Sequence, residues 1–300
     1  MDVGQPSLDQ LRTFLAVVQQ GSFNRAAKKQ GRAISAVSYA IGALEAQLGI
    51  RLFDRQGSRT PQLTEAGSAL LAEVHLIIDD VDSLVARVRG LQSGLEAELS
   101  VAVDVMVPST VLAQMLRDFQ QSFPTVPLRL HVEALGAVAA LVLDGKATIG
   151  IAGPEIVEHP ELESRSVGSV DLIPVAAPVH PLAGAAEIRP GEVRKHLQLV
   201  LTDRSLLTDG QDFSVLSPQS WRLGDLGAKH ALLREGIGWG NMPRHLVAGD
   251  LADGRLAELP LPEQARVDYC LSALWRRDTP PGPASCWLLD TARERLSVAD

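Results

Sequence analysis

Small and hydroxyl-bearing side chains share one face of a predicted helix near the N-terminus. Ser35, Ser38 and Tyr39 recur at helical spacing, opposite an apolar stripe. Such a face can approach base edges in the major groove of DNA, whereas bulky acidic groups there would repel the phosphates. We therefore expect these three residues to face the bases of double-stranded DNA.

A second set of side chains could hold the phosphate backbone. Arg55 and Arg59 flank a turn that contains Ser58, and arginine and hydroxyl side chains are common phosphate contacts. Ser22 precedes a short helix, and Arg32 lies in the break before the next one. We expect DNA contacts from all five residues. The alternative interpretation is a helical hairpin with no role in binding nucleic acid.

Three short helices and a hairpin must position these side chains. Ser22 is a good N-cap for one helix, which residues 30–32 end, and Ser35 opens the next. The apolar stripe of this later helix consists of Val37, Ile41, Leu44 and Leu48. An amphipathic helix over residues 7–20 would complete a small core. The order predicts a winged helix-turn-helix domain over residues 1–65.

A long helix is predicted over residues 66–92. Its apolar residues recur at alternating steps of three and four: Leu71, Val74, Ile78, Val81, Val85 and Val88. A period of 3.5 residues favours pairing with a second helix, although a helix packed on its own domain could show the same residues. We expect a dimerising linker, and the pattern does not distinguish a homodimer from a homotetramer.

From residue 99 onwards, short apolar strands alternate with helices, which is typical of a parallel α/β sheet. We expect strands at 99–105, 128–133, 147–152, 172–177, 197–202 and 267–275. We expect helices at 109–123, with Ser109 as the cap, and at 138–143, 192–195, 226–236 and 284–296.

Short motifs in the first part of the chain resemble LysR-type transcriptional regulators. They are Leu8-Asp9-Gln10-Leu11-Arg12-Thr13-Phe14, Gly21-Ser22-Phe23, Ala26-Ala27, Ala36-Val37-Ser38, Leu44-Glu45, Leu48-Gly49, Leu52-Phe53-Asp54-Arg55 and Leu63-Thr64-Glu65-Ala66-Gly67. Many family members have Gln-Pro early in the recognition helix and Arg after the Ser. This chain departs from that pattern with Ile34-Ser35 and Tyr39. The resemblance implies a sequence-specific DNA-binding regulator whose operator geometry is controlled by a small-molecule effector.

The resemblance extends more loosely over the remaining chain. Its pieces are Ser122-Phe123-Pro124, Gly150-Ile151-Ala152, Pro181-Leu182-Ala183, Gly236-Ile237-Gly238 and Met242-Pro243. It implies an α/β protein overall, with a two-lobe, periplasmic-binding-protein-like effector domain over residues 93–300. Lobe one would comprise 95–165 plus 268–300 and lobe two 166–267, with crossings near 164–172 and 259–267. We expect no cofactor.

In such a fold, ligands bind beyond the carboxyl ends of strands, where helix N-termini offer free N–H groups. Ser109 and Thr110 lie at the first such end and suit a carboxylate or phosphate, so the expected effector is a small organic anion. Thr202 and Asp203 follow a strand of the facing lobe. Each could instead be a helix cap or a turn residue.

Three further residues could line the cleft. Leu135 ends a strand predicted to include residues 133–135 and precedes Gly136, which leaves room for a ligand. Trp221 and Trp239 are large residues in a chain with 4% aromatics, and either could form a wall. Their alternative role is packing.

Charge is divided unevenly along the chain. The net charge is −8, but residues 1–65 carry eight Lys and Arg against five Asp and Glu, a balance of +3. This places the phosphate-facing surface at the N-terminus. The opening residues lack the pattern of a signal peptide, and no window has the apolar length of a membrane span. We expect a cytoplasmic protein.

Other classes of function find less support. No catalytic motif is present, and the seven histidines lack metal-ligand spacing, so we expect neither an enzyme nor a metal site. A thiol redox sensor is an alternative, but Cys270 and Cys286 occupy positions typical of buried, inert thiols. A solute-binding module without gene control is another, which would not explain the basic N-terminal region.

Overall fold

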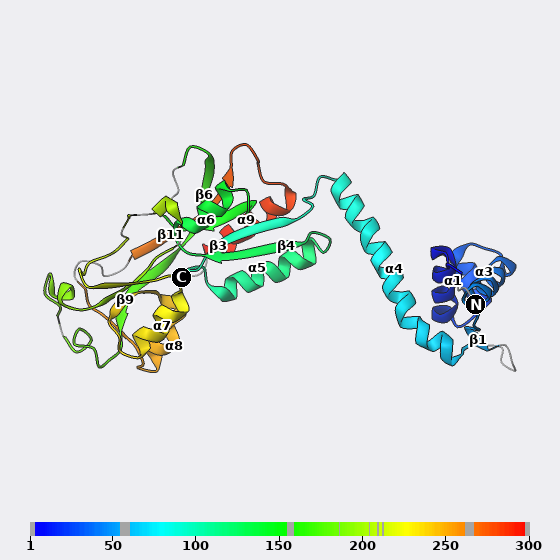
Figure 1. Ribbon diagram of the computed structural model, residues 1–300, viewed down its shortest axis with the longest axis horizontal. Helices are drawn as coiled ribbons and strands as arrows, with labels where there is room; N and C mark the ends of the chain where they lie inside the picture. Colours follow the sequence, from blue (N-terminus) through cyan, green and yellow to red (C-terminus); the bar gives the residue numbers. More distant parts are fainter. Residues whose placement is uncertain are drawn as a thin grey trace. The chain divides into compact units, whose positions relative to one another are not determined.

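The computed structural model describes residues 4–54, 61–154, 159–185, 187–203, 205–208, 210–211, 213–261 and 267–297. The chain divides into two compact units, Met1–Arg89 and Gly90–Asp300. Each unit has its own buried core. Figure 1 labels helices and strands of both units.

The first unit contains the predicted helices and hairpin. Its elements are α1 (Leu8–Gln20), α2 (Phe23–Gln30), α3 (Ile34–Leu48), β1 (Phe53–Asp54), β2 (Gln62–Leu63) and α4 (Glu65–Gln92). Ser22 caps α2 as predicted, and Gly31 ends that helix in the left-handed conformation. The prediction that Ser35 opens the next helix is wrong, because the extended backbone of Ala33 already starts α3 at Ile34. Ser35 is therefore a helical surface residue.

The hairpin is tied to the helices on both sides of it. The carboxylate of Glu45 in α3 accepts hydrogen bonds from the backbone N–H groups of Leu52 (2.8 Å) and Phe53 (3.2 Å). Thr64 Oγ1 donates to the Arg51 carbonyl (2.7 Å) and accepts from the Gly67 N–H (3.0 Å). These bonds fix both ends of the wing and the start of α4.

Gly67→Ala is expected to destabilise the first unit. A Cβ at residue 67 would lie 2.2 Å from the Leu52 carbonyl oxygen, so backbone must move, at a cost of about 1–3 kcal/mol. Thermal unfolding of the full chain measures this loss. Gly42→Ala is the matched control, because a Cβ at residue 42 of α3 would meet open space. Alanine is favoured over glycine inside a helix, so this substitution should stabilise the unit by up to about 1 kcal/mol. Equal stabilisation by both substitutions would contradict the packing at Gly67.

The apolar seam of α4 differs in burial along its length. Val74 and Ile78 are buried in the core of the first unit, so this part of the seam packs on its own domain, as the alternative interpretation had it. Beyond them, Leu84, Val85 and Val88 are exposed. Pairing of this exposed half with a second helix stays a prediction.

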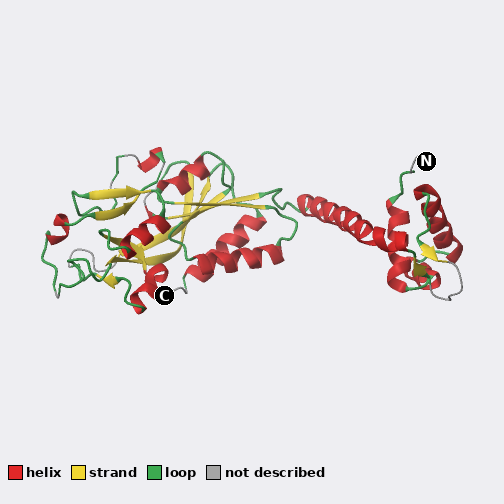
Figure 2. Ribbon diagram, turned by 60° about the horizontal axis from the view of Figure 1, so that its bottom comes forward, coloured by secondary structure: helices red, strands yellow, loops and turns green. Residues whose placement is uncertain are grey.

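The second unit is a mixed sheet with helices against it (Figure 2). Its described strands are β3 (Leu99–Asp104), β4 (Leu128–Glu133), β5 (Ile149–Ala152), β6 (Leu162–Ala176), β7 (Gln198–Leu201), β8 (Ser220–Leu223), β9 (Trp239–Pro243), β10 (Ala257–Glu258) and β11 (Val267–Arg276). Its described helices are α5 (Ser109–Ser122), α6 (Gly136–Leu143), η2 (Glu192–Lys195), η3 (Leu206–Thr208), α7 (Leu226–Arg234), α8 (Arg244–Ala252) and α9 (Pro283–Leu296). The strand order is β4-β3-β5-β11-β6-β9-β7-β8, with β10 beside β6.

Two long antiparallel strands join the lobes of this unit. β6 and β11 pair from Leu172 opposite Val267 to Leu162 opposite Arg276, with a register shift after Leu271. β11 also pairs with β5 in one lobe, and β6 pairs with β9 in the other. The α/β fold class with a two-lobe domain is confirmed. The strand predicted to reach residue 135 instead ends at Glu133, because residues 134–135 turn into α6.

Candidate binding sites

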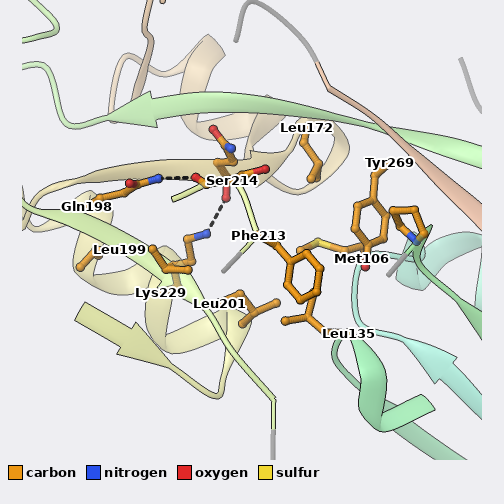
Figure 3. Close-up of a pocket in the computed structure, with 13 residues that line it drawn as sticks. Met106, Leu135, Leu172, Gln198, Leu199, Leu201, Phe213, Ser214, Lys229 and Tyr269 are labelled. Atoms are coloured by element: carbon orange, nitrogen blue, oxygen red, sulfur yellow. Dashed lines mark hydrogen bonds between the residues drawn. The ribbon is translucent and has the colours of Figure 1, made fainter. Parts of the chain in front are cut away.

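A cavity of about 440 Å³ lies in the second unit, within the size range of small-molecule sites. Figure 3 shows Met106, Leu135, Phe213 and Tyr269 gathered on one side, with Leu199 and other polar and apolar residues opposite. The mainly apolar lining would accommodate the hydrocarbon part of a small molecule.

Parallel strands supply one wall of this cavity at their carboxyl ends. Met106, Leu135 and Pro154 line the cavity just after β3, β4 and β5, respectively. The facing wall includes Leu199 and Leu201 of β7. Ligands of open α/β sheets bind in this position, beyond the carboxyl ends of the strands.

Lys229 brings a buried positive charge to the cavity. Asp225 caps α7 by accepting a hydrogen bond from Ala228 N (2.6 Å), and the helix directs Lys229, 3% exposed, into the interior. Its Nζ donates to the Asn241 carbonyl oxygen (2.7 Å). Burial lowers the pKa of Lys229 to about 8, so the ammonium form still predominates at neutral pH. Within the described ranges, no carboxylate forms an ion pair with it.

Asp104 is a buried carboxyl group behind the same wall. It ends β3, is 1% exposed, and accepts hydrogen bonds from Met106 N (2.8 Å) and Tyr269 Oη (3.0 Å). Burial raises the pKa of Asp104 to about 6, against the opposing effect of hydrogen bonds from Met106, Tyr269 and the backbone of Leu135 and Gly153. Asp104 thus joins the ends of three parallel strands to β11.

Backbone strain also concentrates at this cavity. Leu135 (φ 49°) and Ser214 (φ 56°) are the non-glycine residues with positive φ in the described part of the chain, and both line it. Gln198 holds the second of them, since its Nε2 donates to the Ser214 carbonyl (2.8 Å) and its Oε1 accepts from Leu216 N (2.8 Å). Sparsely populated backbone conformations tend to cluster at functional sites.

The structure separates the predicted effector-binding residues. Leu135 lines the 440 Å³ cavity. Thr202 and Asp203 line a different hollow of about 580 Å³, together with acidic residues that include Glu133 and Asp225. Asp203 Oδ1 accepts a hydrogen bond from Thr208 (2.5 Å).

The other predicted effector-binding residues lie outside both hollows. Ser109 and Thr110 are exposed on the first turn of α5. Ser109 does not cap this helix as predicted, because Pro108 holds the N-cap position without a side-chain hydrogen bond. Trp221 lies half-exposed on β8, whereas Trp239 is fully buried in a separate core.

Sequence reasoning missed Lys229, although its position carries a usable signal. In α7, Leu226, Lys229 and Leu233 are spaced i, i+3 and i+7 and are all buried. A lysine on the apolar face of a helix is therefore the pattern that could have identified it. Asp104 is the last residue of an apolar strand, and this position alone does not distinguish a site residue from a turn residue.

The predicted base-facing residues share one exposed surface of α3. Ser35, Ser38 and Tyr39 are exposed, and Tyr39 reaches 78%. Ser22 Oγ accepts from Arg25 N at 3.5 Å as the α2 cap.

The predicted phosphate contacts are only partly described. Nη1 of Arg32 donates to both carboxylate oxygens of Asp9, at 2.9 and 2.8 Å. Fewer N–H donors of this guanidinium are therefore available for DNA phosphates. Arg55, Ser58 and Arg59 lie outside the described residues.

Both cysteines are exposed, so the prediction that they are buried is wrong. Tyr269 and Leu271 take the core-facing positions of β11, and strand alternation puts Cys270 on the other face. In α9, Leu288 and Leu289 face the core and Cys286 does not.

The described residues contain no group of three or more potential metal ligands. They also contain no helix that is long and apolar enough to cross a bilayer.

Two family models match this chain. The bacterial regulatory helix-turn-helix protein, lysR family, matches residues 8–68, and the LysR substrate binding domain matches residues 92–297. The probable HTH-type transcriptional regulator YhaJ of Escherichia coli is 29% identical over 287 residues, covering 94% of each chain. The HTH-type transcriptional regulator AceR of Acinetobacter baumannii is 25% identical over 293 residues, covering 96% of each chain.

Solved structures from Corynebacterium glutamicum have a similar fold. A cysteine mutant of OxyR has a TM-score of 0.55 at 23% identity, covering 98% of this chain and 95% of that one. Full-length LysG with bound effector Arg has a TM-score of 0.51 at 21% identity, covering 97% of this chain and 98% of that one.

Proposed function

This chain belongs to the LysR family of transcriptional regulators, and from that premise we propose that its effector is a small organic anion bound beside Lys229. Family membership assigns DNA binding to the helix-turn-helix region and effector binding to residues 92–297. The family comprises regulators and not enzymes, and we extend this to the chain itself by proposing that the bound effector is not turned over.

The ammonium of Lys229, which forms no ion pair with any described residue, carries this proposal. Burying a charge without a partner is costly, and the ammonium has three N–H donors, of which one hydrogen bond, to the Asn241 carbonyl, accounts for one. A carboxylate in the cavity would supply both the missing charge and acceptors for the other donors. The apolar residues opposite would contact the remainder of the ligand. The Arg bound to LysG also carries a carboxylate.

Effector binding would act by shifting the equilibrium between lobe arrangements. Lys229 belongs to α7 in one lobe, whereas Met106 and Leu135 follow strands of the other. A ligand that contacts both walls binds most tightly to the arrangement that brings them together, and it favours that arrangement by its difference in affinity. We propose that α3 lies in the major groove and that the exposed half of α4 pairs two chains into a dimer or tetramer.

A thermal-shift screen of the full chain against small carboxylic acids tests the effector proposal. A ligand at 100 times its Kd should stabilise the effector-binding unit by about 2.7 kcal/mol. We expect Lys229→Gln to abolish the shift, whereas Ser109→Ala and Thr202→Val should retain it. Loss in Thr202→Val alone would move the effector to the other hollow. If no acid in the panel shifts the melting temperature while DNA binding is intact, control through the exposed thiols of Cys270 and Cys286 would be favoured.

A further inference from the structure

Two large side chains, one aliphatic and one aromatic, are exposed on the surface of α3. Ile34 is 49% exposed and Tyr39 is 78% exposed. They are five positions apart, about 140° around the helix, and Ser35 and Ser38 lie between them on the exposed surface. Four other apolar residues of the helix, including Val37 and Ile41, are buried in the core.

This surface lacks the side chains that make bidentate contacts to bases. Guanine is usually read by Arg or Lys, and adenine by Asn or Gln. Residues 34–44 contain none of these, and Gln47 comes only in the last turn of α3. The carboxylate of Glu45 is bonded to Leu52 and Phe53, and the guanidinium just before the helix, that of Arg32, is bonded to Asp9.

We propose that α3 selects A·T base pairs by contacting thymine methyl groups with the side chain of Ile34 and the ring of Tyr39. The inference rests on the proposed placement of α3 in the major groove. There thymine alone presents a methyl group, and apolar side chains recognise it by contact. Ser35 and Ser38 can bond to any base, so they position the helix without distinguishing the pairs.

Deoxyuridine substitution tests this proposal at the level of one methyl group. The full chain is first used to select binding sites from a library of randomised DNA duplexes. Thymines in a selected site are then replaced one at a time by deoxyuridine, which keeps every base-pairing hydrogen bond and removes the methyl group. We expect selected half-sites with A·T pairs at the contacted positions, and about a fourfold loss of affinity for each contacted thymine.

Variants of the two side chains assign the effect. Ile34→Ala and Tyr39→Ala should each bind thymine and deoxyuridine equally at one position, whereas Tyr39→Phe, which keeps the ring, should retain the difference. Ile50→Ala is the matched control, because Ile50 is 38% exposed outside α3, and it should leave every deoxyuridine effect unchanged.

Two results would overturn the inference in different ways. Selected sites specified by G·C pairs, or tight binding that ignores deoxyuridine, would exclude methyl recognition while leaving α3 in the groove. If the chain binds DNA in a salt-dependent way but enriches no sequence from the library, both the inference and the proposed role of α3 in reading bases would be overturned.

Discussion

Lys229→Met is expected to stabilise the effector-binding unit and to abolish its response to the effector. Burial lowers the pKa of Lys229 from 10.5 to about 8, which corresponds to a cost of about 3 kcal/mol for keeping the charge in the folded state. Methionine is unbranched and adaptable, so it can fill the same space without the charge. Most core substitutions destabilise, so a gain in stability with loss of function would be diagnostic.

Denaturant unfolding of the full chain measures the gain, and its pH dependence identifies the cause. Because the folded-state pKa is depressed, the unfolded state holds more protons between pH 8 and 10.5. The stability of the wild type should therefore rise with pH across this window. The methionine variant should lack that rise. Lys195→Met, at an exposed lysine of the same unit, should change stability by no more than about 0.5 kcal/mol.

A less stable methionine variant would contradict the assignment of Lys229 as an uncompensated charge. It would indicate that the ammonium contributes more through its hydrogen bond to the Asn241 carbonyl, 2.7 Å away, than its burial costs. Effector binding provides an independent check, because a ligand carboxylate beside the ammonium should stabilise the wild type and leave the methionine variant unchanged.

Local signals explain why much of the fold could be predicted from the sequence. The serine cap and terminal glycine of α2 are chemical features of a few neighbouring residues, and the alternating apolar residues of β3 and β4 are equally local. Strand β9 was missed because its Gly240 and Pro243 argue against a central strand. Its place depends on partners: a Cβ at Gly240 would lie 2.6 Å from the Leu199 carbonyl oxygen. Such close approach of two backbones is not visible in one segment.

The candidate site was harder to predict than the elements around it. Leu135 was predicted to line the cleft because it ends a predicted strand before Gly136, and ligands of open sheets bind beyond strand ends; it does line the 440 Å³ cavity. The same reasoning selected Ser109 and Thr110, but the first turn of α5 does not line the 440 Å³ cavity. Which strand ends and helix faces converge is decided by tertiary packing. Lys229 reaches the cavity through its place on the buried face of α7, which a search for helix termini does not consider.

Asp104→Asn should remove a large part of the pH dependence of stability in the same unit. The folded-state pKa of Asp104 is raised from 3.8 to about 6, chiefly by burial. The stabilisation from this group is therefore fully present below pH 3.8 and is lost as pH rises through about 6. The loss amounts to about 3 kcal/mol. Asparagine has nearly the same shape and carries no charge, so the stability of the variant relative to wild type should increase by most of this amount between pH 4 and pH 7.

Urea unfolding of both proteins at intervals across this pH range measures the difference, and Tyr269→Phe tests its origin. The phenol hydroxyl donates to Asp104 Oδ2 at 3.0 Å, and this bond lowers the pKa of the carboxyl group. Its removal should move the midpoint of the pH dependence above 6. A stability difference that is constant with pH would show that Asp104 is solvated or paired. The carboxylate would then not be the buried group that holds the Met106 and Leu135 wall of the cavity to β11.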